Sequence, residues 1–443
     1  MSSKLTSLKH RIGTSLWLAP TAGVVAAFAG AWALQRIDEV LGQDRTAWFL
    51  FGGDAESARE LLSLIASSMI TLTALVFSIT VLALQLASGQ FSPRVIRNFL
   101  RDPATKLAMA TFVGTFVYAI MLLTTVRVSP GEFVPALGVM VAVALVLASV
   151  AVFINYINRI TQSVRAITVL TQVAAETRAS IDEMYPGGVF EEPVAEPFVP
   201  ERAADLVVDH AGAPGVVTTV DEGLLMELAV EADVVIALVP RIGDFVPGGA
   251  PLFRVWGAGH PEGKRLRGAV AIEKERTPDR DPAFGFRQLV DVAIRALSPG
   301  VNDPTTATQS LDHLHDLVRR LTRRRFPSEA RADEHGSLRL VLPRLDYEGY
   351  VRLAFEEIRE YGSESVQVMR RLRDVLTDCI SIAPDGRREV LHAELERATR
   401  ARGVADRSRS RSQASEAPEV SQDPEIAVAL PTDRRGLFQP KGP

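Results

Sequence analysis

Cysteine is nearly absent from this sequence, because the chain of 443 residues contains only Cys379. An intramolecular disulfide is therefore excluded, which is consistent with a reducing compartment for the polar part of the chain. Net charge is also small, since 49 basic residues are balanced by 53 acidic ones and the formal charge is −4. We expect no nucleic-acid partner, because such partners require a strongly basic surface.

Residue patterns that carry common chemistry are also missing. The sequence shows no nucleophile–base pair, phosphate-binding loop, metal-ligand cluster or cofactor fingerprint. His313 and His315 flank one residue and therefore point to different helical faces, which argues against a shared zinc site. We expect no enzyme, no cofactor and no metal, although a site assembled from distant residues leaves no local signature.

Long apolar runs, by contrast, fill the first 158 residues. Four of them are long enough to cross a bilayer, which takes about 20 helical residues. The predicted spans are approximately 16–34, 61–86, 107–125 and 133–157. No Asp, Glu, Lys, Arg or His lies inside these spans, which argues against a proton relay or an ion-coupled transporter. The first run lacks a convincing cleavage site, so we expect a span rather than a signal peptide.

Basic residues predict the orientation of the spans. Lys and Arg are concentrated before the first span and between the second and third, whereas the loop 35–60 is acidic. By the positive-inside rule both termini lie in the cytoplasm. In a bacterium this is a multi-pass protein of the inner membrane, with the lipid bilayer as its first partner.

Two spans carry stripes of uncharged polar residues. In each span, the spacing of these residues places them on one side of the helix. The residues are Ser67, Thr71, Ser78 and Gln85 in the second span, and Thr111, Thr115 and Tyr118 in the third. Such stripes either line a path through an oligomer or hold the helices of a bundle together.

The segment that follows the second span, 91–103, is basic and amphipathic. Ser92 and Pro93 suit the start of a short helix, and Arg94, Arg97 and Arg101 share one side of it. We predict either an interfacial helix in the headgroup plane or a plain basic loop that sets the orientation.

The transmembrane domain is predicted to comprise residues 1–158. The chain that follows it is predicted to form a cytoplasmic α+β domain. The fourth span is predicted to continue as one helix through a connector, 159–185, that either pairs with a second copy or packs on its own domain. A small β-rich module, 201–275, precedes a mainly helical part, 276–403. The polar, proline-containing end, 404–443, is predicted to be a disordered tail.

A turn in the β-rich module, Gly243-Asp244, resembles the hammerhead turn of lipoyl-type modules. Glycine suits such a turn because it adopts positive φ without strain. No lysine occupies an exposed hairpin tip there, so attachment of biotin or lipoate is not expected.

A helical hairpin is predicted within 276–403. Asp281 and Asp303 each precede a proline, a pattern typical of a helix start. On the first helix, Arg287 and Asp291 belong to a predicted ladder of ion pairs. The connection is either a binding site, because a helix N-terminus attracts anions, or a double-capped turn. Its candidate residues are Ser298, Asn302, Asp303, Thr305 and Thr306.

Two stretches resemble the DUF2254 family of predicted bacterial membrane proteins. One is 71–94, which ends in Ser92-Pro93-Arg94, and the other is 281–307, which contains Asn302 and Asp303. The resemblance extends over most of residues 10–400. It implies an inner-membrane protein of unknown function and supplies no catalytic residues.

Together these patterns predict a membrane α-helical fold with four transmembrane helices, joined to a cytoplasmic α+β domain with a small β-rich module and helical hairpins. One functional hypothesis is a homo-oligomeric channel or transport-like protein that its cytoplasmic domain gates. The alternative is a membrane-anchored sensor or scaffold whose cytoplasmic domain binds an unidentified protein or small-molecule ligand.

Overall fold

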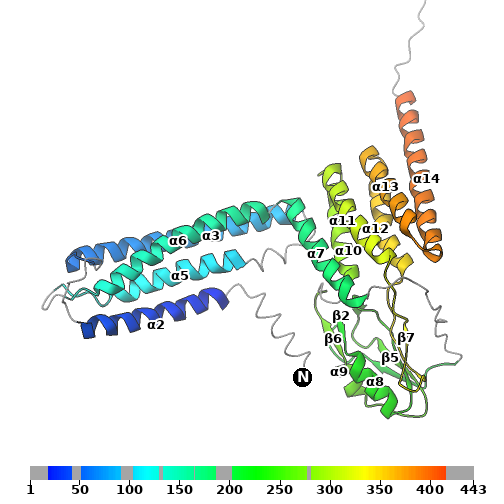
Figure 1. Ribbon diagram of the computed structural model, residues 1–443, viewed down its shortest axis with the longest axis horizontal. Coiled ribbons are helices and arrows are strands. Elements are labelled where there is room, and N and C mark those ends of the chain that lie inside the picture. Colours follow the sequence, from blue (N-terminus) through cyan, green and yellow to red (C-terminus); the bar gives the residue numbers. More distant parts are fainter. Residues whose placement is uncertain are drawn as a thin grey trace, which may run out of the picture.

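Four long helices form one end of the protein, and a domain of helices and small sheets forms the other (Figure 1). The computed structural model describes residues 18–41, 51–90, 103–128, 133–163, 165–185, 202–276 and 281–415. The long helices are α2 (Leu18–Leu41), α3 (Ala55–Gln90), α5 (Pro103–Leu123) and α6 (Ala136–Ser163). Each is long and apolar enough to cross a membrane, which confirms the predicted spans.

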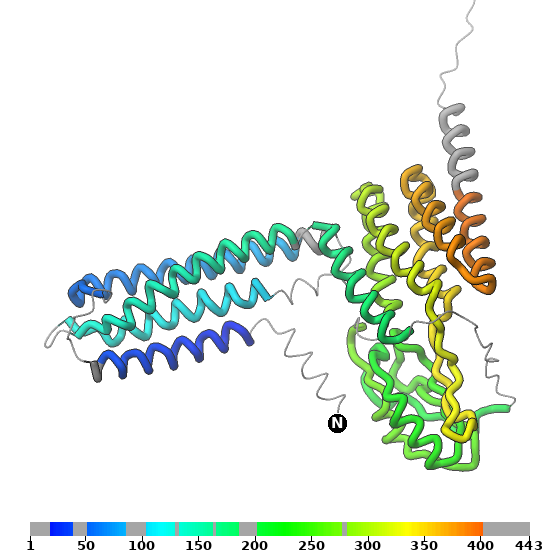
Figure 2. Tube along the Cα trace, in the orientation of Figure 1, coloured from blue at the N-terminus to red at the C-terminus, as the bar shows by residue number. Residues whose placement is uncertain are grey.

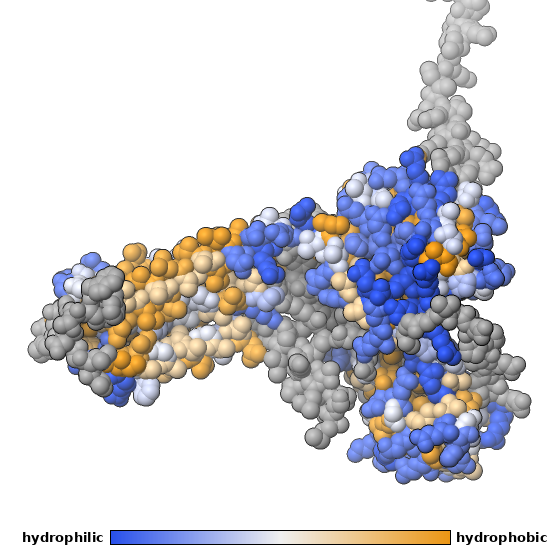
Figure 3. All heavy atoms as spheres, viewed as in Figure 1, coloured by the Kyte–Doolittle hydropathy of each residue, from blue (hydrophilic) through white to orange (hydrophobic). Residues whose placement is uncertain are grey.

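Helix α5 lies at the centre of this bundle and packs against α2, α3 and α6. Small residues allow the closest approach, because a Cβ on Gly23 of α2 would lie 2.5 Å from the Ala110 carbonyl oxygen of α5. Large apolar side chains such as Phe77, Leu147 and Ile154 are exposed. They form part of an apolar surface along the four helices that suits contact with lipid (Figure 3).

The chain changes direction after the fourth long helix (Figure 2). Helix α6 ends at Ser163 and α7 (Ala166–Met184) begins after Arg165, whose backbone is extended at φ −75° and ψ 129°. The prediction of one continuous helix as far as Met184 is therefore wrong. Helix α7 packs against α10 and α11 and buries Leu170 and Ile181 in their shared core, so tertiary contacts set its direction.

Two sheets build the β-rich part of the C-terminal domain. The larger has the order β1-β5-β3-β8-β7, with β3 and β8 parallel and the other pairs antiparallel. The smaller has the order β4-β2-β6. The strands are β1 (Leu206–Asp209), β2 (Gly215–Val220), β3 (Val235–Leu238), β4 (Phe245–Val246), β5 (Pro251–Trp256), β6 (Val270–Glu273), β7 (Ala330–Ala332) and β8 (Leu338–Val341), with the helices α8 (Glu222–Glu231) and α9 (Gly263–Gly268) between them. Strands β7 and β8 thus complete a sheet that begins more than 100 residues earlier, a pairing that the predicted module 201–275 did not include.

Five helices form the rest of the domain around one core. They are α10 (Pro282–Ala296), α11 (Pro304–Thr322), α12 (Tyr347–Tyr361), α13 (Val366–Ile382) and α14 (Asp385–Ser415). Asp281 and Asp303 cap α10 and α11 with proline in the first turn, which confirms the predicted hairpin. Helix α14 continues past its predicted end at Gly403 to Ser415, so the first part of the predicted disordered tail is helical instead.

One group of predicted residues cannot be placed. Arg94, Arg97 and Arg101 lie outside the described residues, so the interfacial helix stays a prediction.

Candidate functional site

The polar stripe of the second span lies on the outer side of the bundle. Ser67, Thr71, Ser78 and Gln85 are all exposed on α3. The Ser67 hydroxyl donates to the Leu64 carbonyl at 3.0 Å, and Thr71 donates to the Ser67 carbonyl at 2.9 Å. These bonds stay within α3, so this stripe does not hold the described helices of one chain together.

The polar stripe of the third span, by contrast, faces α6. Thr115 and Tyr118 are buried, whereas Thr111 is half-buried. The Tyr118 hydroxyl donates to the Gly138 carbonyl at 2.9 Å, and the Thr115 and Ser149 hydroxyls lie 3.4 Å apart. The arrangement matches the interpretation as bundle packing.

The sequence pattern predicted no role for Asp38, which is a buried acidic residue of α2. The first span was predicted to end at residue 34, but α2 continues and the apolar segment suited to a membrane reaches Asp38. Its two carboxylate oxygens accept hydrogen bonds from the backbone N–H groups of Leu137 and Gly138, at 3.2 and 3.1 Å. Asp38 therefore caps the first turn of α6 from a neighbouring helix, where a negative charge is favourable.

The loop between α10 and α11 is closed by its own side chains. One Asp303 carboxylate oxygen accepts from the backbone N–H groups of Thr305 and Thr306, both at 3.1 Å, and the other accepts from the Thr306 hydroxyl at 2.6 Å. Hydrogen bonding, chiefly from the Thr306 hydroxyl, lowers the pKa of Asp303. Ser298 donates to the Arg295 carbonyl, and Asn302 has a positive φ of 46°. The carboxylate already occupies the helix N-terminus, as the interpretation as a double-capped turn requires.

Arg287 connects α10 with α12, in addition to taking part in the predicted ladder of ion pairs on α10. Its Nε donates to Asp291 on the same helix at 2.6 Å, and its two terminal nitrogens each donate to one carboxylate oxygen of Glu357 on α12. The hydrogen bond with Glu357 is the main reason why the pKa of Arg287 is raised. The sequence pattern predicted Asp291 as a partner and missed Glu357, which lies 70 residues away.

A cavity of about 310 Å³ lies next to this ion pair, where four parts of the chain meet. Its walls come from the β-rich part, from α10, from α12 and from the end of α7. The apolar lining includes Val220, Leu238, Ile242, Ala283, Leu342, Leu345, Tyr350 and Leu353, and the charged lining includes Glu222, Asp244, Arg276, Asp281, Arg344 and Glu357. Its volume is at the lower end of the range of about 300–1,000 Å³ that is typical of small-molecule sites.

The Gly243 turn forms part of one wall together with Arg276. The Arg276 guanidinium makes a two-point ion pair with Asp281, at 2.6 and 3.1 Å, and lies 5.4 Å from the centre of the Phe284 ring. Gly243 has a φ of 91°, and a Cβ there would lie 2.5 Å from the guanidinium. Glycine is thus required by both backbone conformation and space, and the turn joins the β-rich part to the start of α10.

The end of α7 forms another wall and is firmly held. The buried Tyr185 ring packs 4.7 Å from the ring of Phe326, and its hydroxyl lies 3.1 Å from that of Tyr350. The Tyr185 carbonyl accepts a hydrogen bond from Arg324 at 3.0 Å. Because Met184, Tyr185 and Tyr350 all line the cavity, whatever fills it touches the helix that follows the fourth span.

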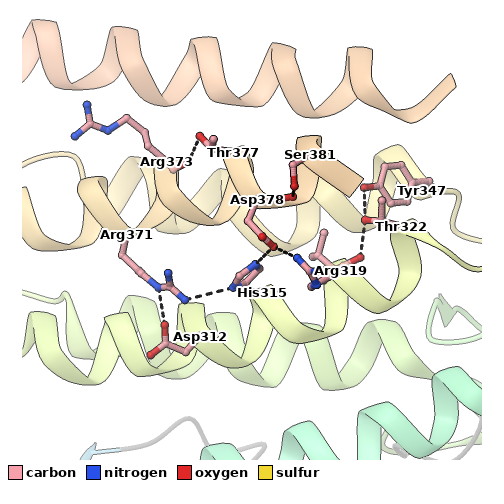
Figure 4. A network of polar contacts seen from close by, with 11 residues as sticks. Asp312, His315, Arg319, Thr322, Tyr347, Arg371, Arg373, Thr377, Asp378 and Ser381 are labelled. Carbon is pink, nitrogen blue, oxygen red and sulfur yellow. Dashed lines mark hydrogen bonds and ion pairs between the residues drawn. The ribbon is translucent and has the colours of Figure 1, made fainter. Parts of the chain in front are cut away.

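A second polar cluster joins α11 to α13, away from the cavity (Figure 4). The Asp378 carboxylate lies between His315, at 2.7 Å, and Arg319. Arg371 approaches the other ring nitrogen of His315 at 3.3 Å and donates to Asp312 at 2.6 Å. The cluster is a chain of alternating charges across the helix pair.

His315, Asp378 and Cys379 place their donor atoms within 4.8 Å of one another, which invites a test for a metal site. Guanidinium groups of Arg319 and Arg371 engage the Asp378 and His315 donors. Burial raises the pKa of the Cys379 thiol to about 12, so it stays protonated at neutral pH. The donor atoms of His315 and Asp378 are thus already engaged by guanidinium groups, and the arrangement is that of an ion-pair network.

Comparison with known proteins identifies the family. A family model described as a predicted membrane protein, DUF2254, matches residues 13–378. The chain belongs to this family. Uncharacterised proteins of Mycobacterium bovis and Mycobacterium tuberculosis are each 34% identical to this DUF2254 protein over 389 residues, which is 85% of this chain and 74% of the relative. No solved structure matches it.

Proposed function

We propose that this DUF2254 protein is a membrane-anchored sensor whose C-terminal domain binds a small molecule. The observation that carries the proposal is the position of the cavity, between the β-rich part, the helical core and the end of α7. Ligands commonly bind at such junctions because several elements contribute walls. The basic residues before the first span and between the second and third support a cytoplasmic position for this domain, at the inner membrane of a bacterial cell.

The same contacts connect the cavity to the helix that follows the fourth span. Tyr185 is fixed to Tyr350 and Phe326, so a change in the cavity walls acts on the end of α7. Helix α6 ends at Ser163 and α7 begins at Ala166, and the extended backbone of Arg165 just before α7 can serve as a hinge. A ligand that prefers one arrangement of α7 shifts the populations of both arrangements by its difference in affinity.

The test is a thermal-shift screen of the full chain in lipid nanodiscs with neutral, cationic and anionic small molecules. Ala283 lines the cavity, so Ala283→Trp fills it, whereas Ala332→Trp adds the same bulk at the exposed last residue of β7. We expect a ligand to raise the melting temperature of the wild type and of Ala332→Trp but not of Ala283→Trp. The ligand is also expected to protect the backbone amides of α7 from hydrogen exchange. If every compound shifts all three proteins equally, the proposal fails.

A channel-like assembly is the second candidate, and one observation favours it. Ser67, Thr71, Ser78 and Gln85 are exposed on α3, where they would face a second copy or a shared path. Native mass spectrometry of the nanodisc-held protein tests this candidate. A trimer or larger ring, with solute flux that Ser78→Leu and Gln85→Leu reduce, supports a channel gated by the C-terminal domain, whereas a monomer contradicts it.

A further inference from the structure

The acidic groups of the cavity are mostly engaged within the chain. Asp281 is paired with Arg276 and Glu357 with Arg287, both in two-point contacts. The Asp244 carboxylate accepts from the backbone N–H of Arg241 at 3.0 Å. These three carboxylates are therefore neutralised or capped before any ligand arrives, and a further lining carboxylate, Glu356, lies 4.0 Å from Arg352.

Arg344 is a basic residue of the cavity whose guanidinium is incompletely satisfied. Its Nη2 donates to Glu222 at 2.5 Å, while its buried Nε has no hydrogen-bond partner among the described residues. The side chain as a whole is only 19% exposed. A guanidinium carries five N–H donors, so the carboxylate of Glu222 uses only part of the hydrogen-bonding capacity of Arg344.

A second arginine and a second carboxylate lie next to this pair, and the carboxylate of Glu329 accepts a hydrogen bond from the backbone N–H of Arg344 at 3.1 Å. Arg331 lies 3.7 Å from the same Glu222 carboxylate, which is 45% exposed and therefore partly shared with water. Burial, followed by the nearby Arg344 charge, lowers the pKa of Arg331. Two guanidinium groups thus share the carboxylate of Glu222, and of the two arginines Arg344 lines the cavity.

The wall next to Arg344 is apolar. Pro343 and Leu345 flank it in the sequence, and Leu238, Leu342 and Leu353 line the same cavity. A ligand that fits this combination has an acid group at one end and a short hydrocarbon part at the other. The volume of about 310 Å³ excludes a long acyl chain lying fully inside.

We propose that the cavity binds a small amphiphilic anion, with its acid group on Arg344 and its apolar part against Leu238, Leu342 and Leu353. This inference rests on the proposed sensor function and names the ligand class of the same site. The acid group supplies a further acceptor to the Arg344 guanidinium beside Glu222, and a charge-assisted hydrogen bond to guanidinium is among the stronger polar contacts in proteins.

The experiment is isothermal titration of the full chain in nanodiscs with n-octanoate, with the heat from empty nanodiscs subtracted to remove partition into lipid. We expect saturable binding to the wild type and binding at least about tenfold weaker to Arg344→Gln. Arg344→Lys keeps the charge and is expected to retain part of the affinity. Arg370→Gln removes an exposed arginine of α13 and is the matched control, expected to leave binding unchanged.

A second variant separates ligand binding from a structural role of Arg344. Glu222→Gln removes the competing carboxylate, so we expect n-octanoate to bind more tightly, whereas loss of a merely structural ion pair would weaken binding. n-Octyl phosphate in place of n-octanoate distinguishes a phosphate from a carboxylate head group, and binding of either that depends on Arg344 supports the proposal.

Two results overturn the assignment of the ligand class. One is equal binding of n-octanoate to the wild type and Arg344→Gln, and the other is equal or tighter binding of n-octylammonium. If a cationic or neutral compound binds and Ala283→Trp abolishes its binding, the sensor function stands and this ligand class is wrong. If Ala283→Trp changes nothing for any compound, the sensor function itself fails.

Discussion

At the scale of single residues, Arg387 shows how a buried cation holds two helices. It is 3% exposed, lies over the rings of Phe326 and Tyr347, and donates to the carbonyls of Leu321 and Thr322 at 2.8 and 3.0 Å. These carbonyls belong to the end of α11, where the last C=O groups lack helical partners. Arg387 therefore caps α11 from the first turn of α14.

Replacing this residue tests the cap. Arg387→Ala removes the side-chain donor from both carbonyls, although Leu321 keeps its hydrogen bond from the backbone N–H of Arg324, and is expected to cost about 1–3 kcal/mol of unfolding free energy. The adjacent Arg388 is 49% exposed and pairs only with Asp385, so Arg388→Ala is expected to cost no more than about 0.5 kcal/mol. Urea unfolding of the full chain measures both values, and equal costs would contradict the capping role.

Two glycines of the β-rich part have similar backbones and different surroundings. Gly243 and Gly249 have φ angles of 91° and 78°. A Cβ on Gly243 would collide with the Arg276 guanidinium, whereas a Cβ on Gly249 would meet nothing within 4 Å. Comparing substitutions at the two glycines therefore separates the cost of backbone strain from the cost of steric overlap.

We expect Gly249→Ala to cost about 1–2 kcal/mol from positive φ alone. Gly243→Ala should cost clearly more, because the ion pair of Arg276 with Asp281 must also move. Thermal unfolding of the two variants provides the comparison. A Gly243→Ala variant no less stable than Gly249→Ala would show that the close packing against Arg276 is unimportant.

At the scale of elements, charge rather than shape alone fixes α11 against α13. Asp378 of α13 contacts both His315 and Arg319 of α11 (Figure 4). The hydrogen bond from Arg319 is the largest cause, and that from His315 the next, of the lowered pKa of Asp378. A carboxyl group with a lower pKa in the folded state stabilises the fold above its unfolded pKa, which is about 3.9 for Asp.

This shift predicts a change of stability at acidic pH. The contribution of Asp378 is complete above about pH 4–5 and is lost as the pH falls through the lower folded pKa. Asp378→Asn is therefore expected to be less stable than the wild type at pH 7 and to lose less stability between pH 5 and 3. Asp374→Asn removes an exposed carboxylate of the same helix as a control. Parallel pH profiles for the wild type and Asp378→Asn would rule out this account.

At the scale of the whole molecule, the β-rich part and the helical part are one unit. Strand β8 pairs in parallel with β3 through Ile236 and Leu340, and both side chains are buried. Without β8, this edge of β3 would expose unpaired backbone groups and apolar surface. The sheet therefore cannot be completed by residues 201–275.

A fragment comparison tests this dependence. Residues 201–275 alone are expected to show no cooperative unfolding, whereas residues 165–415, which add α7, β7, β8 and the helical core, are expected to unfold cooperatively. Circular dichroism during heating measures both. A stable, cooperatively folded 201–275 fragment would contradict the dependence on β8.

The elements that the sequence predicted correctly depend on local patterns. The four spans follow from uninterrupted apolar runs, because any charge in such a run is costly in lipid. The starts of α10 and α11 follow from Asp281 and Asp303 before proline, because an N-cap needs only its own next three residues. The family follows from the two stretches 71–94 and 281–307.

The candidate site could not be predicted in this way, because its groups come from distant segments. Arg344 and Glu222 are 122 residues apart and Arg287 and Glu357 are 70 apart, and no periodicity links them. Asp38 caps a helix that begins nearly 100 residues later. A residue type shows that such a group needs a partner, but only the packing of helices and strands supplies it.

The sequence by itself thus determined which segments are apolar enough to enter a membrane, where the main helices of the hairpin begin, and the family. The tertiary structure decided the break between α6 and α7, the exposure of the stripe on α3 and the cavity at the end of α7. The physical reason is that hydropathy and capping act within one helix, whereas direction, exposure and cavities depend on what packs against it.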